Sequence, residues 1–318
     1  MNNLYSFLII LFISVSLHAQ VIKNYKEVDV TFPSKNIKLN GSLMTPLDQS
    51  SNTAVLIISG SGPTDRNGNS TYSQTNNLLQ IAQFLALHNI ASLRYDKRAI
   101  QRNNYLISEE QNLRFGQFTK DAEAAIQFLK KKKFKEIFVI GHSQGALIAS
   151  VAVQKEKVDG LVTLCGAGKT GDQIIEEQIN AIPQKEFTNQ AIPILKILRE
   201  GKQTQDVPIT LRSLFRPSVQ PFLISWFAVD PIEEIHNVKC PILIVAGKQD
   251  VQIPIGDSEL LYKASKKRSK LVILNNMNHV LKDVGPDLKK NRASYNDPNK
   301  PISKELVNEI LKFIHSNK

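Results

Sequence analysis

One pentapeptide constrains this chain more than any other feature: Gly141-His142-Ser143-Gln144-Gly145. It follows the apolar run 137–140, which is typical of a buried strand, and precedes the helix-like stretch 146–149. A G-x-S-x-G motif at a strand-to-helix turn is a nucleophile elbow, where the tight turn exposes the serine and leaves no room for side chains at the two glycines. This context predicts that Ser143 is a nucleophile.

A serine hydroxyl is a poor nucleophile near neutral pH, so it needs a histidine as base and a carboxylate that orients the histidine. His279 is the candidate base because it lies in a short loop after the strand-like run 271–274. Asp250 is the candidate carboxylate because its loop follows 241–246, which has the pattern of a buried parallel strand. The order Ser, Asp, His is the one expected after such an elbow.

Two other aspartates compete with Asp250 for the carboxylate role. Asp257 is placed to start a helix and to cap it, which is a common structural use of aspartate. Asp283 lies beyond the histidine in the chain. We therefore expect neither of them to orient His279.

The third requirement is a pair of backbone N–H groups that bind the oxyanion formed when the serine attacks an acyl carbon. One comes from the residue after the nucleophile and the other from the loop after an early strand. The loop 59–69 follows such a strand, so the expected donors are the amides of Ser61 and Gln144. Taken alone, this loop is equally consistent with an ordinary glycine turn, and Asp65 and Arg66 either order it or contact the substrate.

Together these motifs resemble the α/β-hydrolase superfamily and, within it, a bacterial carboxylesterase group often filed as serine-aminopeptidase-like hydrolases. The resemblance covers nearly the whole chain after residue 19. It rests on segments 59–69, 93–98, 141–145, 214–222, 247–250 and 277–279. It implies a Ser-Asp-His esterase that acts on modest acyl esters without a cofactor. Peptidase, thioesterase and acyltransferase activities use the same constellation and stay open, as does a non-catalytic binding protein with this fold.

The order of apolar patterns predicts an α/β fold with a mostly parallel central sheet and flanking helices. A strand-rich stretch covers 27–45, and strand and helix patterns alternate after it as far as 161–164, with one of the helix patterns at 121–129. The next convincing strand starts only at Ile242, which is far beyond the length of an ordinary crossover. Amphipathic stretches at 174–182 and 192–198 indicate a helical cap inserted at about 170–235.

The insertion contains an apolar cluster, Leu223, Trp226 and Phe227, close to its return to the sheet. We expect these residues to line the acyl pocket and to favour short to medium acyl chains. Each buried methylene contributes about 0.8 kcal/mol only while the pocket has room for it. The alternative is that the cluster only holds the cap on the core.

Residues 1–19 are predicted to be a secretory signal peptide and residues 20–318 a single α/β-hydrolase domain. The segment 4–17 is mostly apolar but too short for a comfortable membrane span, and Ala19 marks the expected cleavage site. An uncleaved anchor is the alternative. The expected location of the mature protein is the periplasm or the extracellular space.

The formal net charge of +11 raises the question of nucleic-acid binding. The basic clusters 130–133 and 266–268 lie at the ends of helix-like segments, where cations complement the helix dipole. No nucleic-acid-binding motif accompanies them. We expect the partner to be a small-molecule ester and not a nucleic acid.

Cys165 and Cys240 fall at opposite ends of predicted neighbouring strands. Since a disulfide needs Cα atoms within about 7 Å, we expect two free buried thiols. Along the sequence, cysteines, histidines and carboxylates do not cluster at the spacing of metal ligands, so no metal site is expected.

Overall fold

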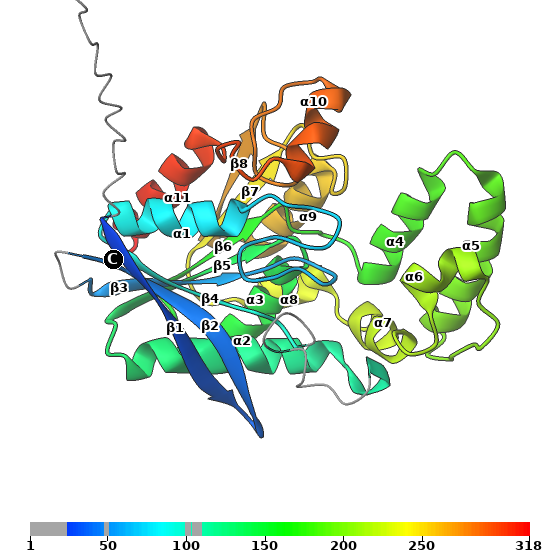
Figure 1. Cartoon of the computed structure of the whole chain (residues 1–318), viewed down its shortest axis with the longest axis horizontal. Helices are drawn as coiled ribbons and strands as arrows, with labels where there is room; N and C mark the ends of the chain where they lie inside the picture. The colour runs from blue at the N-terminus through cyan, green and yellow to red at the C-terminus, as the bar shows by residue number, and fades with distance from the viewer. Residues whose placement is uncertain (1–23, 48–50, 99–102, 104–109) are drawn as a thin grey trace, which may run out of the picture.

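The computed structural model of the chain describes residues 24–47, 51–98, 103 and 110–318 (Figure 1). The expected signal peptide, residues 1–19, lies outside these ranges, so its cleavage stays a prediction. None of the helices in the described ranges has the length and apolar character that a membrane crossing demands.

One eight-stranded sheet forms the centre of the molecule, with the strand order β1-β2-β4-β3-β5-β6-β7-β8. β1 and β2 form an antiparallel hairpin at one edge, β2 also pairs antiparallel with β4, and the neighbours from β4 onward are parallel. The strands are β1 (Tyr25–Ser34), β2 (Ile37–Pro46), β3 (Thr53–Ile58), β4 (Ala91–Tyr95), β5 (Glu136–His142), β6 (Gly160–Leu164), β7 (Ile242–Gly247) and β8 (Ser269–Leu274). This sheet and its flanking helices confirm the predicted fold class.

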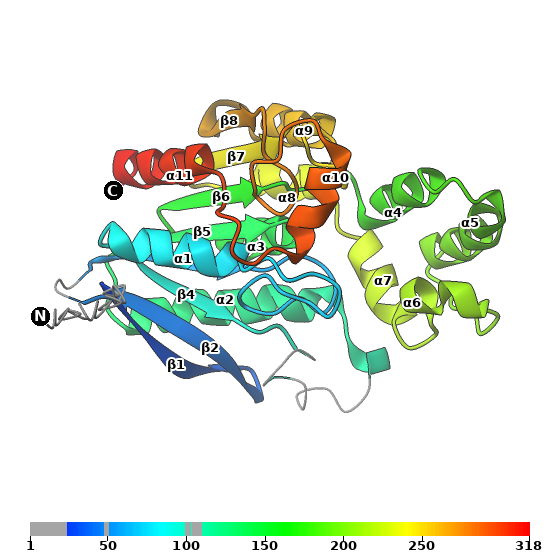
Figure 2. The same ribbon diagram turned by 45° about the horizontal axis from the view of Figure 1, so that its top comes forward.

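The apolar runs are continuous in the inner strands because helices cover both faces of the sheet. In β5, Ile137 and Val139 belong to the apolar cluster on one face, and Phe138 and Ile140 to the cluster on the other. Helices α2, α3, α8 and α9 contribute to the first cluster, and α1 and α11 to the second (Figures 1 and 2). These helices are α1 (Asn77–Leu87), α2 (Phe115–Lys131), α3 (Gln144–Lys155), α8 (Pro231–Asn237), α9 (Ile255–Ser265) and α11 (Lys304–Ser316).

α2 begins earlier than the helix pattern at 121–129 predicts. Phe115 and Phe118 are buried in its first turn, so the apolar face of the helix extends toward its N-terminus. This extra turn brings the start of α2 against the helices inserted between β6 and β7.

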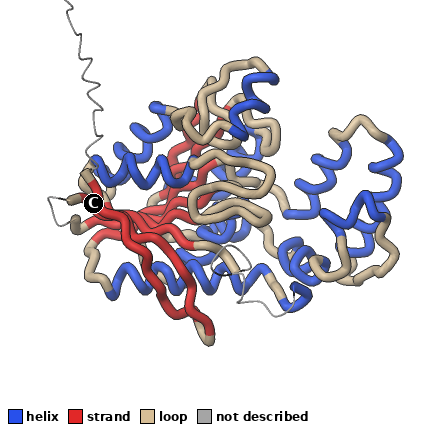
Figure 3. Tube along the Cα trace, viewed as in Figure 1, coloured by secondary structure: helices blue, strands red, loops and turns tan. Residues whose placement is uncertain are grey.

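The insertion between β6 and β7 forms a separate helical group beyond the carboxyl ends of the strands (Figure 3). It comprises α4 (Gly171–Asn180), α5 (Lys185–Arg199), α6 (Arg212–Phe215) and α7 (Gln220–Phe227). These helices, which we call the cap, occupy the stretch for which a cap was expected. They bury an apolar core of their own, made of Ile175, Ile179, Ala191, Ile194, Leu195, Leu198, Val207, Leu211, Phe215 and Leu223.

The cap contacts the rest of the molecule, the body, at the start of α2. Arg216 forms an ion pair with Glu110, whose carboxylate also accepts a hydrogen bond from Ser218. Phe222 packs against Phe118 with 5.5 Å between the ring centroids. After α7 the chain returns to the body through α8, which packs on α3 and α9.

Candidate active site

The predicted elbow is present where β5 ends and α3 begins. Ser143 adopts φ 55° and ψ −124°, a backbone conformation that costs free energy for a residue with a side chain. A Cβ atom on Gly141 would lie 2.2 Å from the carbonyl oxygen of Gly145, and one on Gly145 would lie 2.5 Å from that of Ile58. The two glycines therefore allow helix α3 and strand β3 to approach the turn that presents Ser143.

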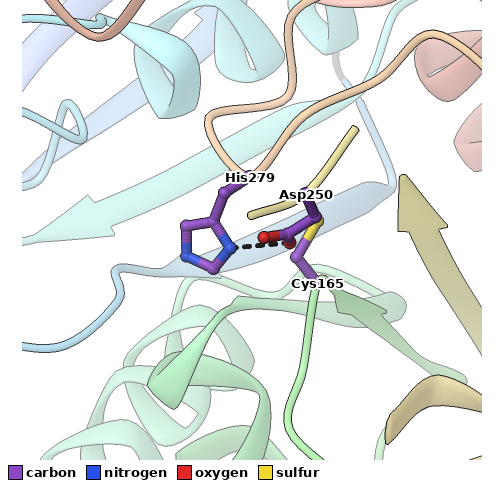
Figure 4. Close-up of side chains that lie close together, drawn as sticks. All are labelled: Cys165, Asp250 and His279. Atoms are coloured by element: carbon purple, nitrogen blue, oxygen red, sulfur yellow. Dashed lines mark hydrogen bonds and ion pairs between the residues drawn. The ribbon is translucent and has the colours of Figure 1, made fainter. Parts of the chain in front are cut away.

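Asp250 and His279 lie in the loops after β7 and β8, and their side chains meet (Figure 4). His279 Nδ1 lies 2.7 Å from Asp250 Oδ2, and both side chains are almost fully buried. Asp250 Oδ1 accepts hydrogen bonds from the backbone amides of Gln252 and Ile253. The contact at Nδ1 leaves Nε2 of His279 for proton exchange with another group.

Burial raises the pKa of the Asp250 carboxyl, but His279 and the two amides outweigh it and hold the pKa below its ordinary value. The carboxylate is therefore ionised at neutral pH. A negative charge at this place favours the Nδ1–H tautomer of His279.

The rival aspartates lie in other surroundings. Asp257 is the third residue of α9, so the expectation that it caps this helix is wrong. Its Oδ1 instead accepts a hydrogen bond of 2.9 Å from the amide of Gly168, in the segment that leads from β6 to the cap. The side chain of Asp283 is exposed. Asp257 is buried, and its hydrogen bond to the Gly168 amide fixes the segment that connects β6 to the cap.

His142 is a residue whose role the sequence did not indicate. Its Nε2 lies 2.8 Å from the carbonyl oxygen of His279, so the ring donates this hydrogen bond. Burial, followed by the neighbouring His279, lowers the pKa of His142 to about 3, so the ring is neutral. His142 thus joins the elbow to the backbone of the candidate base. Only the fold reveals this contact, because 137 positions separate the two residues.

The expected oxyanion donors lie beside the elbow. A Cβ atom on Gly60 would be 3.1 Å from the Cβ of Ser143, which places the loop 59–62 against the nucleophile. Within the described part of the chain, the amides of Ser61 and Gln144 have no hydrogen-bond acceptor. Both residues line the same hollow as Ser143. Two free donors therefore border the space next to the serine.

Asp65 and Arg66 order the loop after β3. The carboxylate of Asp65 accepts hydrogen bonds of 2.8 Å from the amides of Asn67 and Asn69. The guanidinium of Arg66 binds Asp96 through Nε at 3.0 Å and Nη2 at 2.6 Å. Both side chains are thus bound within the protein. Of the two roles that the sequence left open, these contacts support ordering of the loop.

The hollow beside Ser143 has a volume of about 90 Å³. Its lining includes residues of the body and the cap: Ser61, Ser143, Gln144, Leu147, Ala167, Lys169, Ile174, Ile175, Gln178, Trp226, Pro231, Gln252 and Ile253. Larger hollows of about 920 and 450 Å³ lie elsewhere, beside α1 and beside the amino ends of β7 and β8, and contain none of the candidate catalytic residues. We therefore take the smaller hollow as the candidate active site, because Ser143 and the expected oxyanion donors line it.

Of the three residues expected in the acyl pocket, the structure brings only Trp226 to this hollow. Leu223 is buried in the core of the cap, and Phe227 packs against that core beside Trp226. Ile174 and Ile175 of α4 take the place expected for them. The amphipathic pattern at 174–182 indicated a helix there, but the pattern did not show which face would meet the site.

Cys165 lies beside Asp250 and His279 (Figure 4). One candidate ligand atom from each of these residues lies within 4.8 Å of the others, so the fold brings together residues that are not at metal-ligand spacing in the sequence. They come from the loops after β6, β7 and β8. Burial raises the pKa of the Cys165 thiol well above its usual range, and metal ligation requires a thiolate. In these surroundings the Cys165 thiol is neutral and packs against Asp250.

Both cysteines are free thiols, as expected. Cys165 is buried, but Cys240 is only half-buried, so the expectation of burial is wrong for the second cysteine. Cys240 directly precedes β7, at the amino end of the strand and away from the candidate site, and its side chain is partly exposed there.

Comparisons with known proteins agree with this architecture. A family model described as serine aminopeptidase, S33, matches residues 71–214, a range that contains Ser143 but not Asp250 or His279. Esterase EstD of Thermotoga maritima is 23% identical over 294 residues, which cover 89% of this chain and 68% of that protein.

Solved structures with this fold include esterases from distant organisms. Est1E from Butyrivibrio proteoclasticus matches with a TM-score of 0.56 and 18% identity, covering 91% of this chain and 99% of that one. The Pyrococcus furiosus esterase Pf2001 matches with a TM-score of 0.61 and 17% identity, over 92% and 91%. The α/β hydrolase GrgF from Penicillium sp. sh18 matches with a TM-score of 0.62 and 18% identity, over 92% and 99%. At these identities the likeness to the solved structures establishes the α/β-hydrolase fold.

Proposed function

We propose that this protein is a serine hydrolase that cleaves carboxylic esters with short to medium acyl chains. The observation that carries the proposal is the hydrogen bond of 2.7 Å between His279 Nδ1 and Asp250 Oδ2 at the sheet edge that also presents Ser143. An ionised carboxylate on Nδ1 of a buried histidine is the arrangement that a serine nucleophile requires. The similarity to EstD, which is named an esterase, supports the same reaction class.

In the proposed reaction, Ser143 Oγ attacks the acyl carbon while His279 Nε2 takes the hydroxyl proton. Asp250 stabilises the imidazolium that forms, and the amides of Ser61 and Gln144 bind the oxyanion. The tetrahedral intermediate then expels the alcohol, which receives the proton from His279, and an acyl-enzyme remains. Water attacks this ester with His279 as base, and the same steps release the acid and free Ser143.

The proposed preference for short to medium acyl chains rests on the hollow beside Ser143. Its volume of about 90 Å³ corresponds to a few water molecules, given that one takes about 30 Å³ in the liquid. Apolar side chains of Leu147, Ile174 and Ile175 line it, as an acyl chain requires. A long chain would need the cap to move away from the body.

The test compares the wild type with Ser143→Ala and, as a control, Ser150→Ala. Ser150 lies in the same helix α3, is buried, and donates its hydroxyl to the carbonyl of Ala146 at 2.9 Å. We expect fluorophosphonate labelling and hydrolysis of p-nitrophenyl acetate and butyrate by the wild type and by Ser150→Ala. Ser143→Ala should show no labelling and a loss of kcat of at least about 10⁴-fold.

Two results would contradict the proposal. One is retained ester hydrolysis by Ser143→Ala. The other is a wild type that cleaves aminoacyl anilides or thioesters far better than any ester in the panel, which would move the activity to a peptidase or thioesterase with the same catalytic groups.

Export is part of the proposal and rests on the sequence of residues 1–19 alone. We expect the mature protein to begin at Gln20 and to be recovered from the periplasm or the medium. Mass spectrometry of the protein from its native host measures the N-terminus. A chain that begins at Met1 and sediments with membranes would instead favour an anchor.

A further inference from the structure

Lys97 is a buried amine behind the loop that carries one of the expected oxyanion donors. It lies two residues after β4 and is only 3% exposed. Its Nζ donates a hydrogen bond to the carbonyl oxygen of Gly60. The ring of Phe118 also lies near it, at 6.0 Å from Nζ to the centroid.

The surroundings of Lys97 differ from those of the arginines near it. Each of these arginines forms an ion pair with a carboxylate: Arg66 with Asp96, Arg94 with Glu27, and Arg98 with Asp121. Lys97 has no such pair within the described ranges, and burial alone lowers its pKa to about 7. An amine buried without a carboxylate destabilises the fold. Its contact with Gly60 therefore calls for an explanation other than stability.

The carbonyl of Gly60 and the N–H of Ser61 belong to the same peptide unit. Because a trans peptide is planar, its C=O and N–H groups point in opposite directions. Lys97 holds the oxygen end of this unit inside the body, and Ser61 lies at the hollow beside Ser143. A donor on the oxygen fixes the rotation of the peptide plane and polarises the N–H into a stronger donor.

We propose that Lys97 is a positioning residue that orients and polarises the Gly60–Ser61 peptide, so that the amide of Ser61 binds the oxyanion more tightly. The inference rests on the proposed function, since it needs an oxyanion at Ser143. Lys97 acts through the peptide and does not touch the substrate. Its contribution arises in the transition state, when negative charge develops on the acyl oxygen.

The experiment replaces Lys97 by Met, which has a similar length but no donor. The readouts are kcat and KM for p-nitrophenyl acetate, with active sites counted by fluorophosphonate labelling, and the Kd of a short alkyl boronic acid that forms a tetrahedral adduct on a serine. We expect kcat to fall about tenfold or more with KM within about twofold, since removing a whole oxyanion donor costs about 10²- to 10³-fold. The boronic acid should bind about tenfold more weakly.

Lys282→Met is the matched control. Lys282 is fully buried and its Nζ donates to the carbonyl of Asp297, away from residues 59–62. It follows His279 by three positions, so a general loosening of the catalytic loops would show in this variant as well. We expect its kcat per labelled site and its boronic acid affinity to stay within about twofold of the wild type.

Where Lys97→Met does not fold, Lys97→Leu is measured instead, because its smaller apolar side chain needs no hydrogen-bond partner in a buried place and should lose kcat in the same direction. An unchanged kcat per labelled site, a rise in KM alone, or equal losses in Lys282→Met would overturn the inference. If the wild type neither hydrolyses esters nor labels, the proposed function itself fails and takes this inference with it. If the wild type is active and the Lys97 variant is equally active, the inference fails but the proposed function stands.

Discussion

The body and the cap differ in what fixes their positions. The candidate catalytic residues follow β5, β7 and β8, whose backbones are hydrogen-bonded into one sheet through β6. The cap helices α4 to α7 share an apolar core of their own and meet the start of α2 through side chains such as Arg216 and Phe222. Backbone pairing thus sets the geometry of the catalytic groups, whereas individual side chains set the position of the cap.

This difference separates two kinds of effect. A substitution at the sheet edge that alters a group near the reacting atoms should lower kcat with little change in substrate range. A substitution in the cap should change which substrates fit, or how often the site opens, with little change in the chemistry.

Removing the base or the carboxylate should give the largest loss. We expect His279→Ala to lower kcat by at least about 10⁴-fold and Asp250→Asn by about 10⁴-fold, because the amide no longer favours the productive tautomer of the histidine. Asp257→Asn is the control, since this buried aspartate bonds to Gly168 on the way to the cap. Steady-state kinetics with p-nitrophenyl acetate measures all three. A greater loss of kcat in Asp257→Asn than in Asp250→Asn would refute the assignment of the carboxylate.

His142 also lies in the body, and its replacement by Phe should lower kcat by an intermediate amount. The change removes the hydrogen bond to the carbonyl of His279 and frees the backbone of the base, and a small misplacement of a catalytic group costs about ten- to a hundredfold in rate. The buried carbonyl left without a donor should destabilise the fold by about 1–3 kcal/mol.

Kinetics and thermal unfolding of His142→Phe and His142→Gln together test this role. Glutamine keeps a donor, so we expect it to recover part of kcat. If both variants lose stability but keep the wild-type kcat, His142 has no part in placing the base.

The sequence predicted those parts of the body that depend on local patterns. The continuous apolar runs specified the inner strands, and the glycines at Gly141 and Gly145 specified the elbow, because steric limits of this kind act between near neighbours. Chain order then predicted that Asp250 and His279 belong together. Their contact in the structure agrees with that pairing.

Contacts between distant segments could not be predicted in this way. Cys165 lies beside Asp250, and Asp257 bonds to Gly168 across 89 positions, because neighbouring strands bring their loops together. The contact of Lys97 with Gly60 arises in the same manner. In the cap, periodicity located α4 and α5, but it did not show that Leu223 faces the cap's own core while Trp226 faces the hollow.

Trp226→Ala should change selectivity at nearly constant chemistry. The indole lines the hollow and packs on Gly171 at the start of α4, where an added Cβ would lie 2.7 Å from the ring. Its removal should lengthen the pocket and shift the preference from acetyl and butyryl toward hexanoyl and octanoyl esters, by about threefold to tenfold in relative kcat/KM.

The matched control for this change is Phe227→Ala, which removes a neighbouring aromatic ring that packs on the cap core. We expect Phe227→Ala to lower the unfolding temperature without changing the order of preferred esters. An unchanged chain-length profile in Trp226→Ala would mean that the acyl chain binds elsewhere and that Trp226 only holds the cap.

The smallest effect should come from the ion pair that joins the cap to the body. Burial raises the pKa of Glu110, but the hydrogen bonds from Arg216 and Ser218 outweigh it, so the pKa lies below its usual range. A lowered pKa means that the pair stabilises the fold above the unfolded pKa of about 4.3, and that this contribution is lost as the pH falls through the folded pKa. Because both side chains are partly exposed, Glu110→Gln should cost less than about 1 kcal/mol at pH 7.

Glu156→Gln is a fitting control because Glu156 pairs with Lys130 between α2 and α3, within the body. Both variants should lose a similar small stability at pH 7, and each difference should vanish once the pH falls below the lowered folded pKa of the glutamate that was replaced. Only Glu110→Gln should speed proteolytic cleavage within the cap, by about twofold to fivefold, since local opening there needs this contact to break. Equal cleavage rates in the two variants would show that the apolar contact of Phe222 with Phe118 holds the cap. The cap would then be held on the body by side-chain packing and not by charge.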